Sequence, residues 1–247
     1  MTYCLAIKVN SGLILASDSR TNAGVDYVST YSKMHVFGTP GERFFVLLTA
    51  GNLATSQAVV NTLKRDLDNP AAPVSLNTVE YLFDAAHYIG SVSNRVQQGH
   101  ADALKQTGVS PEASFILGGQ IRDKTHDIYL VYPQGNYIAA SPETPYLQIG
   151  ESKYGKPILD RVITPATSLE DAARCALVSL DSTMRSNISV GPPLELTFYR
   201  KDGLSTERHL TLEANSPLIR RIQRGWNDGL RRAFNGLSRF EWEPKDE

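Results

Sequence analysis

The chain has 247 residues, of which 41% are hydrophobic and 21% charged, the composition of one ordinary globular domain with a large core. Lysine and arginine together number 25 against 26 aspartates and glutamates, so the formal net charge is -1. A chain so close to neutral has no overall field that would attract nucleic acid or an anionic membrane, and neither partner is expected.

Residues 2–50 alternate short apolar runs with turns, a pattern typical of β-hairpins. The sequence predicts strands at 2–9, 13–19, 33–37 and 43–50, with turns at 10–12, around Gly24 and at 38–41. Apolar residues spaced three and four apart then predict two helices, over 53–67 and 78–105, which pack one face on a sheet.

A second set of strands is expected at 113–121, 126–133 and 136–141. A helix over 167–185 follows, because Thr167 and Glu170 have the spacing of a capping box ahead of an apolar stripe. Two further strands are expected at 193–200 and 207–213. The last helix begins at 215–217, with Pro217 at its first helical position.

This order predicts an α+β fold, a four-layer α-β-β-α sandwich of two antiparallel sheets flanked by helices. Residues 1–214 are expected to form the main domain, with residues 215–247 as a C-terminal helical extension of that domain.

The extension carries an apolar stripe surrounded by arginines, made of Ile219, Ile222, Trp226, Leu230, Ala233 and Leu237. Such a stripe favours a subunit contact, since its exposure to solvent would be costly. A helix that binds a membrane surface or nucleic acid is the alternative, against which Glu241 and Glu243 count.

Cysteine and histidine spacing predicts neither a disulfide framework nor a metal site. Cys4 and Cys175 lie far apart without CxxC spacing, which suits a reducing cytosol, and the five histidines show no HxxxH or HxH pattern. The N-terminal stretch has no basic leader, and Lys8 and Asn10 interrupt its apolar run, so no secretory signal is expected. The longest largely apolar stretch, 44–50, is far shorter than the roughly 20 residues of a membrane-spanning helix. A cytoplasmic location follows as an expectation.

Thr2 becomes the first residue if Met1 is removed, and an N-terminal threonine carries its own base. Its α-amino group has an ordinary pKa of about 7.7 to 8, so the neutral fraction near pH 7 accepts the hydroxyl proton, directly or through water. A nearby ammonium would hold that pKa down, and a carboxylate would hold the ammonium in place. Lys33 and Asp18 are the candidates for these two charges.

Several segments together resemble the β-subunits of proteasomes and of the related bacterial ring protease, which are N-terminal-nucleophile hydrolases. They are the segments 2–8 and 12–20, Gly24, Ser32-Lys33-Met34-His35 and Thr49-Ala50-Gly51. The resemblance covers nearly the whole chain in element order. Within that superfamily the chain is most similar to the bacterial Anbu (ancestral β-subunit) group, because no propeptide is expected before Thr2 and a basic helical extension closes the chain.

The resemblance implies a role for each matching residue. Thr2 would be the nucleophile, Asp18 would orient the lysine, Lys33 would tune the nucleophile, and the amide of Gly51 would stabilise the oxyanion. The chemistry of Gly51 agrees, because free N–H groups between a strand and a helix favour negative charge. Thr21, Thr49 and Leu53 are the expected substrate-pocket positions.

The chain also departs from the family pattern. A Ser-Gly pair usually follows the Ile-Gly turn, whereas Ile149-Gly150 is followed by Glu151, so Ser152 is the candidate, displaced by one position. In the family's Arg-Asp-x-x-Ser motif, Ser186 stands in place of the carboxylate, ahead of Ser189. A hydroxyl accepts a hydrogen bond but supplies no charge, so the pKa and the orientation of the terminal amine need not match those in the family. Capping of the preceding helix is an equal alternative role for Ser186 and Ser189.

The sequence therefore predicts a threonine peptidase that cleaves peptide or amide bonds through an acyl-Thr2 ester, without cofactor or metal, in a homo-oligomeric ring or open helical ring. A small-amide amidase and a catalytically weak ring scaffold are the alternatives. Cys4 shares a strand face with Thr2, and an inert packed thiol is preferred there over a nucleophile because the sequence offers it no histidine partner.

Overall fold

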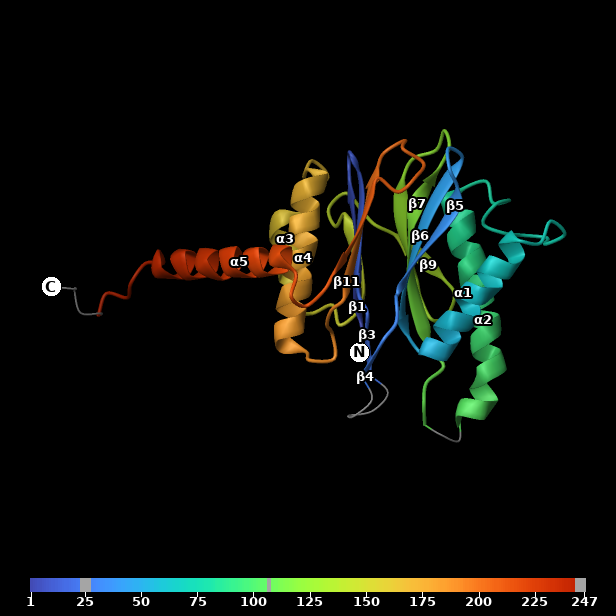
Figure 1. Cartoon of the computed structure of the whole chain (residues 1–247), viewed down its shortest axis with the longest axis horizontal. Coiled ribbons are helices and arrows are strands. Elements are labelled where there is room, and N and C mark those ends of the chain that lie inside the picture. Colours follow the sequence, from blue (N-terminus) through green and yellow to red (C-terminus); the bar gives the residue numbers. More distant parts are fainter. Residues whose placement is uncertain (23–27, 106–107, 243–247) are drawn as a thin grey trace.

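The computed structural model describes residues 1–22, 28–105 and 108–242, and it shows two five-stranded antiparallel sheets stacked between helices (Figure 1). The first sheet has the order β10 (Tyr146–Gly150), β1 (Tyr3–Val9), β2 (Gly12–Asp18), β11 (Leu194–Arg200) and β12 (Arg208–Leu212). The second sheet runs β5 (Met34–Thr39), β6 (Arg43–Gly51), β7 (Ala113–Ile121), β8 (Asp127–Val131) and β9 (Tyr137–Ala139).

Helices cover the outer face of each sheet. α1 (Leu53–Leu67) and α2 (Leu82–Lys105) pack on the second sheet, while α3 (Lys156–Val162) and α4 (Leu169–Ser186) pack on the first. A short hairpin of β3 (Arg20–Asn22) and β4 (Val28–Thr30) extends from the end of β2. The predicted four-layer α-β-β-α sandwich is confirmed.

Three apolar clusters hold the layers together. The cluster between the sheets includes Cys4, Leu15, Val46, Leu48 and Ile116. The other two lie under α4 and under α1 and α2. Because side chains alternate along a strand, Cys4 points into the cluster between the sheets, while Tyr3 and Leu5 point towards α4.

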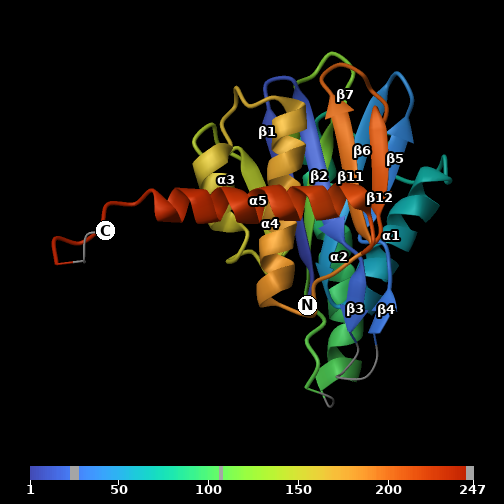
Figure 2. The ribbon, with the colours of Figure 1, turned by 60° about the vertical axis from the view of Figure 1, so that its left-hand side comes forward.

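α5 (Pro217–Asn235) crosses α4 and then projects away from the body of the molecule (Figure 2). Its first turns are anchored, because Ile219 is buried against the α4 side and Gln223 Nε2 donates to Asp181 Oδ1 at 2.7 Å. The C-terminal half is exposed, with Leu230 at 50% and Phe234 at 74%. The predicted boundary at residue 214 remains a prediction.

The structure corrects several sequence predictions. α2 begins at Leu82 and not at Thr78, because local side-chain hydrogen bonds hold a turn there: Thr78 Oγ1 accepts from Ser75 N, and Asp84 accepts from Tyr81 N. β10 and α3 were not expected, since each is too short for a clear periodic pattern. The predicted turn at Gly24 lies outside the described residues.

The capping box at the start of α4 is displaced by one residue. The N-cap is Ser168, whose Oγ accepts from Asp171 N at 3.1 Å, so the pair is Ser168 and Asp171 and not Thr167 and Glu170. Thr167 instead accepts from Thr164 N in the preceding turn. Within the described residues no helix is long and apolar enough to cross a bilayer.

Candidate active site

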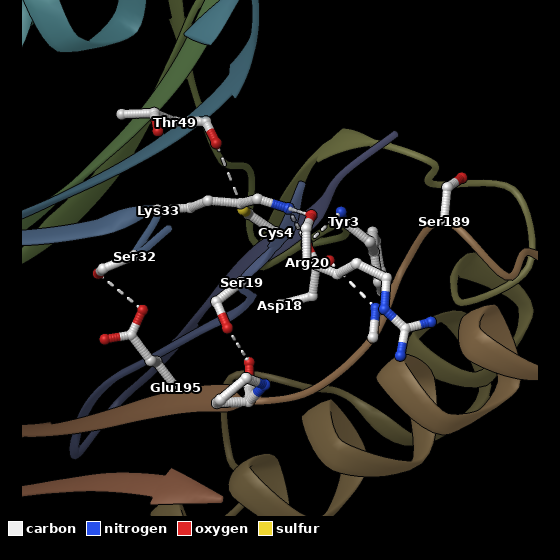
Figure 3. A network of polar contacts seen from close by, with 12 residues as sticks. Tyr3, Cys4, Asp18, Ser19, Arg20, Ser32, Lys33, Thr49, Ser189 and Glu195 are labelled. Carbon is white, nitrogen blue, oxygen red and sulfur yellow. Dashed lines mark hydrogen bonds and ion pairs between the residues drawn. The ribbon is translucent and has the colours of Figure 1, made fainter. Parts of the chain in front are cut away.

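Lys33 and Asp18 form a buried ion pair at the end of the sandwich where the chain begins (Figure 3). Lys33 Nζ lies 2.7 Å from Asp18 Oδ1 and also donates to the carbonyl of Arg20 at 2.7 Å. The Asp18 side chain is 0% exposed and that of Lys33 6%. Asp18 ends β2 and Lys33 immediately precedes β5, so the pair joins the two sheets.

Backbone amides complete the surroundings of Asp18. Its Oδ1 accepts from Tyr3 N at 3.0 Å, which fixes the start of β1, and its Oδ2 accepts from Gly191 N at 3.2 Å. Burial raises the pKa of the Asp18 carboxyl, while the Lys33 ammonium and these two amides act in the opposite direction. The carboxylate therefore connects the residue that follows Thr2, the lysine and the segment after α4.

Thr2 directly precedes Tyr3, whose amide binds Asp18, and is half-buried. Its carbonyl accepts from Glu151 N at 2.7 Å, directly beyond the Tyr3–Gly150 pair that ends the β1–β10 ladder. Met1 precedes Thr2 in the structure, so the Thr2 nitrogen is an amide. Burial and the Lys33 charge lower the pKa of the Met1 amino group, and Asp18 and Glu151 act in the opposite direction.

Gly51 lies exposed where β6 ends and α1 begins. Its φ of +105° and the 2.4 Å approach of an added Cβ to the carbonyl of Glu112 explain why glycine stands here. Asn52 caps the helix by accepting from Thr55 N at 3.1 Å. The first turn of α1 contains no acidic residue, so no carboxylate offsets the positive end of the helix dipole there.

The three predicted pocket residues lie on different elements. Thr21 is in β3, and Leu53 is the first residue of α1. Thr49 in β6 donates its amide to the carbonyl of Lys33 at 2.9 Å and accepts from Cys4 Sγ at 3.6 Å. Burial raises the pKa of the Cys4 thiol, which fits an inert packed side chain.

The three candidate serines lie in two segments, which the hydrogen bond from Asn187 to Glu151 joins. Ser152 follows β10, and its carbonyl accepts from Lys156 N at 3.1 Å at the start of α3. Ser186 is the exposed last residue of α4. Ser189 stands at the edge of the network in Figure 3, and its amide donates to Asn187 Oδ1 at 3.0 Å.

Four residues at this end of the molecule were missed by sequence reasoning. Glu151 is only 8% exposed, and its Oε2 accepts from Asn187 Nδ2 at 2.9 Å. Arg20 Nη1 donates to the carbonyl of Ile188 at 2.7 Å. A Cβ at Gly191 would meet the Arg20 guanidinium at 2.3 Å, so a larger side chain there would push the Arg20 side chain aside. Glu151 carried a sequence signal, since it occupies the position where the family serine was expected.

Other groupings in the described chain do not suggest metal chemistry. No set of three or more histidine, cysteine, aspartate or glutamate side chains is placed to hold an ion in those residues. A cavity of about 830 Å³ lies between the end of α1 and the first half of α2 and is lined by residues including Arg65, Tyr88 and Arg95. Because none of its lining residues belongs to the Lys33–Asp18 network, this cavity belongs to a different part of the surface.

Comparison with known proteins gives consistent matches over nearly the full length. A model of the proteasome subunit family matches residues 2–197. Anbu (ancestral beta-subunit) from Yersinia bercovieri is 43% identical with a TM-score of 0.91, over 98% of this chain and 100% of that chain. The helical assembly of the Anbu complex from Pseudomonas aeruginosa is 45% identical with a TM-score of 0.90, over 97% and 98% respectively. An Anbu (Gly-1) mutant from Hyphomicrobium sp. strain MC1 is 40% identical with a TM-score of 0.91, over 98% and 100%.

Proposed function

The chain belongs to the proteasome subunit family, and from that premise we propose that it is a threonine-type N-terminal-nucleophile hydrolase whose nucleophile is Thr2. The observation that carries the proposal is the buried Lys33–Asp18 pair beside the start of β1. Removing Met1 turns the Thr2 nitrogen from an amide into an amine next to these charges. The proposal therefore requires that processing step.

The proposed reaction has two halves. Thr2 Oγ attacks the carbonyl carbon of a peptide or amide bond, and the Thr2 amine takes the hydroxyl proton. The oxyanion forms near the Gly51 amide, and Lys33 stabilises negative charge on Oγ. The amide C–N bond then breaks, the leaving amine takes the proton from the Thr2 ammonium, and an acyl-Thr2 ester remains. Water, deprotonated by the same amine, hydrolyses the ester and restores Thr2.

We also propose that the chain works as a homo-oligomeric ring or open helical ring in the cytoplasm. A similar solved structure is described as the helical assembly of the Anbu complex from Pseudomonas aeruginosa. The exposed half of α5 supplies an apolar surface suited to a contact between copies.

Covalent capture tests the proposed nucleophile. Protein whose N-terminal residue is shown by mass spectrometry to be Thr2 is incubated with a threonine-directed β-lactone or epoxyketone. We expect an adduct on Thr2, loss of that adduct in Thr2→Ala, and an unchanged adduct in the exposed control Thr206→Ala.

Two outcomes would contradict the proposal: no adduct on Met-free protein, or an equal adduct in Thr2→Ala. Capture by small amides but not by peptide-like reagents would favour an amidase. An assembled ring without any capture would favour a scaffold.

A further inference from the structure

Glu151 directly follows β10 and is joined to Thr2 by a backbone hydrogen bond. Tyr3 pairs with Gly150, and the next hydrogen bond runs from Glu151 N to the Thr2 carbonyl at 2.7 Å. Gly150, with a φ of +81°, ends the regular strand, so Glu151 begins the segment that leaves the sheet. The Glu151 backbone therefore lies beside Thr2, and its carboxylate acts on the amino group of the preceding residue, Met1.

The Glu151 carboxylate is buried without a strong cationic partner in the described chain. Its side chain is 8% exposed, and the cation paired with it is Lys153, at 3.6 Å, whose own side chain is 67% exposed. An ion pair with so exposed a lysine contributes little. A buried carboxylate is costly unless a charge or several hydrogen bonds compensate it, so Glu151 can accept a further cationic donor.

Asn187 holds the carboxylate from the α4 side. Its Nδ2 donates to Glu151 Oε2 at 2.9 Å, while its Oδ1 accepts from the amide of Ser189. With both ends of its side-chain amide engaged, Asn187 is fixed in orientation. Ser186, which stands where the family carries a carboxylate, is exposed and supplies no charge.

We propose that Glu151, held by Asn187, is the positioning residue that receives the α-ammonium of processed Thr2 and supplies the negative charge that Ser186 does not. The proposal rests on the proposed function in one respect, that Thr2 becomes the N-terminal residue.

The charges that face the amine come from several elements. Lys33 before β5 opposes the ammonium form, whereas Asp18 in β2 and Glu151 after β10 favour it. These influences already act on the Met1 amino group. Processing moves the amine by one residue, to Thr2, whose carbonyl accepts from Glu151 N. Removing the Glu151 charge should therefore lower the pKa of the Thr2 amine, because Lys33 is then less opposed.

The pH dependence of carbamoylation by cyanate measures this pKa without requiring catalysis, since only the neutral amine reacts. The rate at Thr2 is followed by mass spectrometry of the N-terminal peptide from folded, Met-free protein. We expect Glu151→Gln to move the midpoint down by about one pH unit, which raises the neutral fraction below the midpoint about tenfold. Asn187→Ala should move it in the same direction by less, and Glu151→Asp should stay closer to the wild type.

Glu80→Gln is the matched control, because Glu80 is an exposed glutamate in the segment between α1 and α2. The role of Glu151 is overturned if Glu151→Gln titrates like the wild type or if Glu80→Gln shifts equally. If Glu151→Gln does not fold, an unshifted midpoint in folded Asn187→Ala overturns it instead. The two proposals can fail separately. If Glu151→Gln shifts the midpoint but the β-lactone does not label Thr2 of the Met-free protein, the proposed hydrolase activity is rejected and the role of Glu151 stands.

Discussion

Asp18 and Lys33 show how burial determines the role of a charged residue. Each would be an ordinary turn or strand-end charge if exposed, but the pair is almost fully buried and its ionic contact is 2.7 Å. Neutralising one partner leaves the other charge buried without compensation, which costs about 3 to 5 kcal/mol. The pair is therefore a structural link between the sheets as well as a candidate catalytic group.

Asp18→Asn should lower the free energy of unfolding by about 3 kcal/mol and should abolish Thr2 capture. Urea unfolding measures the first effect and mass spectrometry the second. Asp127→Asn is the control, because its partner Lys8 is one-third exposed and that pair should contribute at most about 1 kcal/mol. An equal decrease of the unfolding free energy in Asp18→Asn and Asp127→Asn would show that burial does not set the contribution of the ion pair. The double change Asp18→Asn with Lys33→Met should recover part of the stability without recovering capture.

At the scale of elements, the start of α4 is specified by one side chain. Ser168 accepts from Asp171 N, and the helix then buries one face against β1 and β2. The start of α5 differs, because its N-cap Ser216 makes no side-chain hydrogen bond to the first turn. The two serines occupy equivalent positions with different contacts.

Ser168→Ala should destabilise the protein by about 1 kcal/mol, since it leaves a helix N–H without its acceptor. Ser216→Ala should change the unfolding free energy by less than about 0.5 kcal/mol. Thermal or urea unfolding of the two variants under identical conditions measures the difference. A larger decrease of the unfolding free energy in Ser216→Ala than in Ser168→Ala would contradict the assignment of Ser168 as the capping side chain.

At the scale of the whole molecule, α5 is half anchored and half exposed. Ile219 is buried at its start, whereas Leu230 and Phe234 are exposed on the projecting half (Figure 2). Leu230 continues the predicted apolar stripe of the last helix, and Phe234 lies one turn further along. An isolated subunit leaves this surface in water, so a second copy is the occupant that the assembly proposal requires.

Leu230→Gln combined with Phe234→Gln should weaken assembly by about 3 kcal/mol per contact, roughly a hundredfold in the dissociation constant. Sedimentation velocity across a concentration series should then show smaller species than the wild type. Arg232→Gln is the control, because it introduces the same side chain on the opposite face of α5. Unchanged assembly in the double variant would exclude this half of α5 as the contact.

Local patterns predicted most of the fold. α1 and β7 have the predicted ends, because clear periodicity and flanking turn residues define them. β10 was missed because five residues, one of them the glycine of an expected turn, give too short an alternation. Within the site, Asp18 and Lys33 were found by resemblance, whereas Asn187 was not, since an asparagine at a helix end is normally a cap.

The sequence by itself determined the order of the strands and helices, the four-layer class and the candidate nucleophile, because periodicity, turn residues and short motifs are local properties of the chain. Only the tertiary structure decided that Glu151 is hydrogen-bonded to the backbone of Thr2 and that Asn187, 36 residues further along the chain, holds its carboxylate. The burial of the Lys33–Asp18 pair was decided there as well. The physical reason is that burial and ion pairing depend on which distant segments pack together, and strand register and helix ends set that packing.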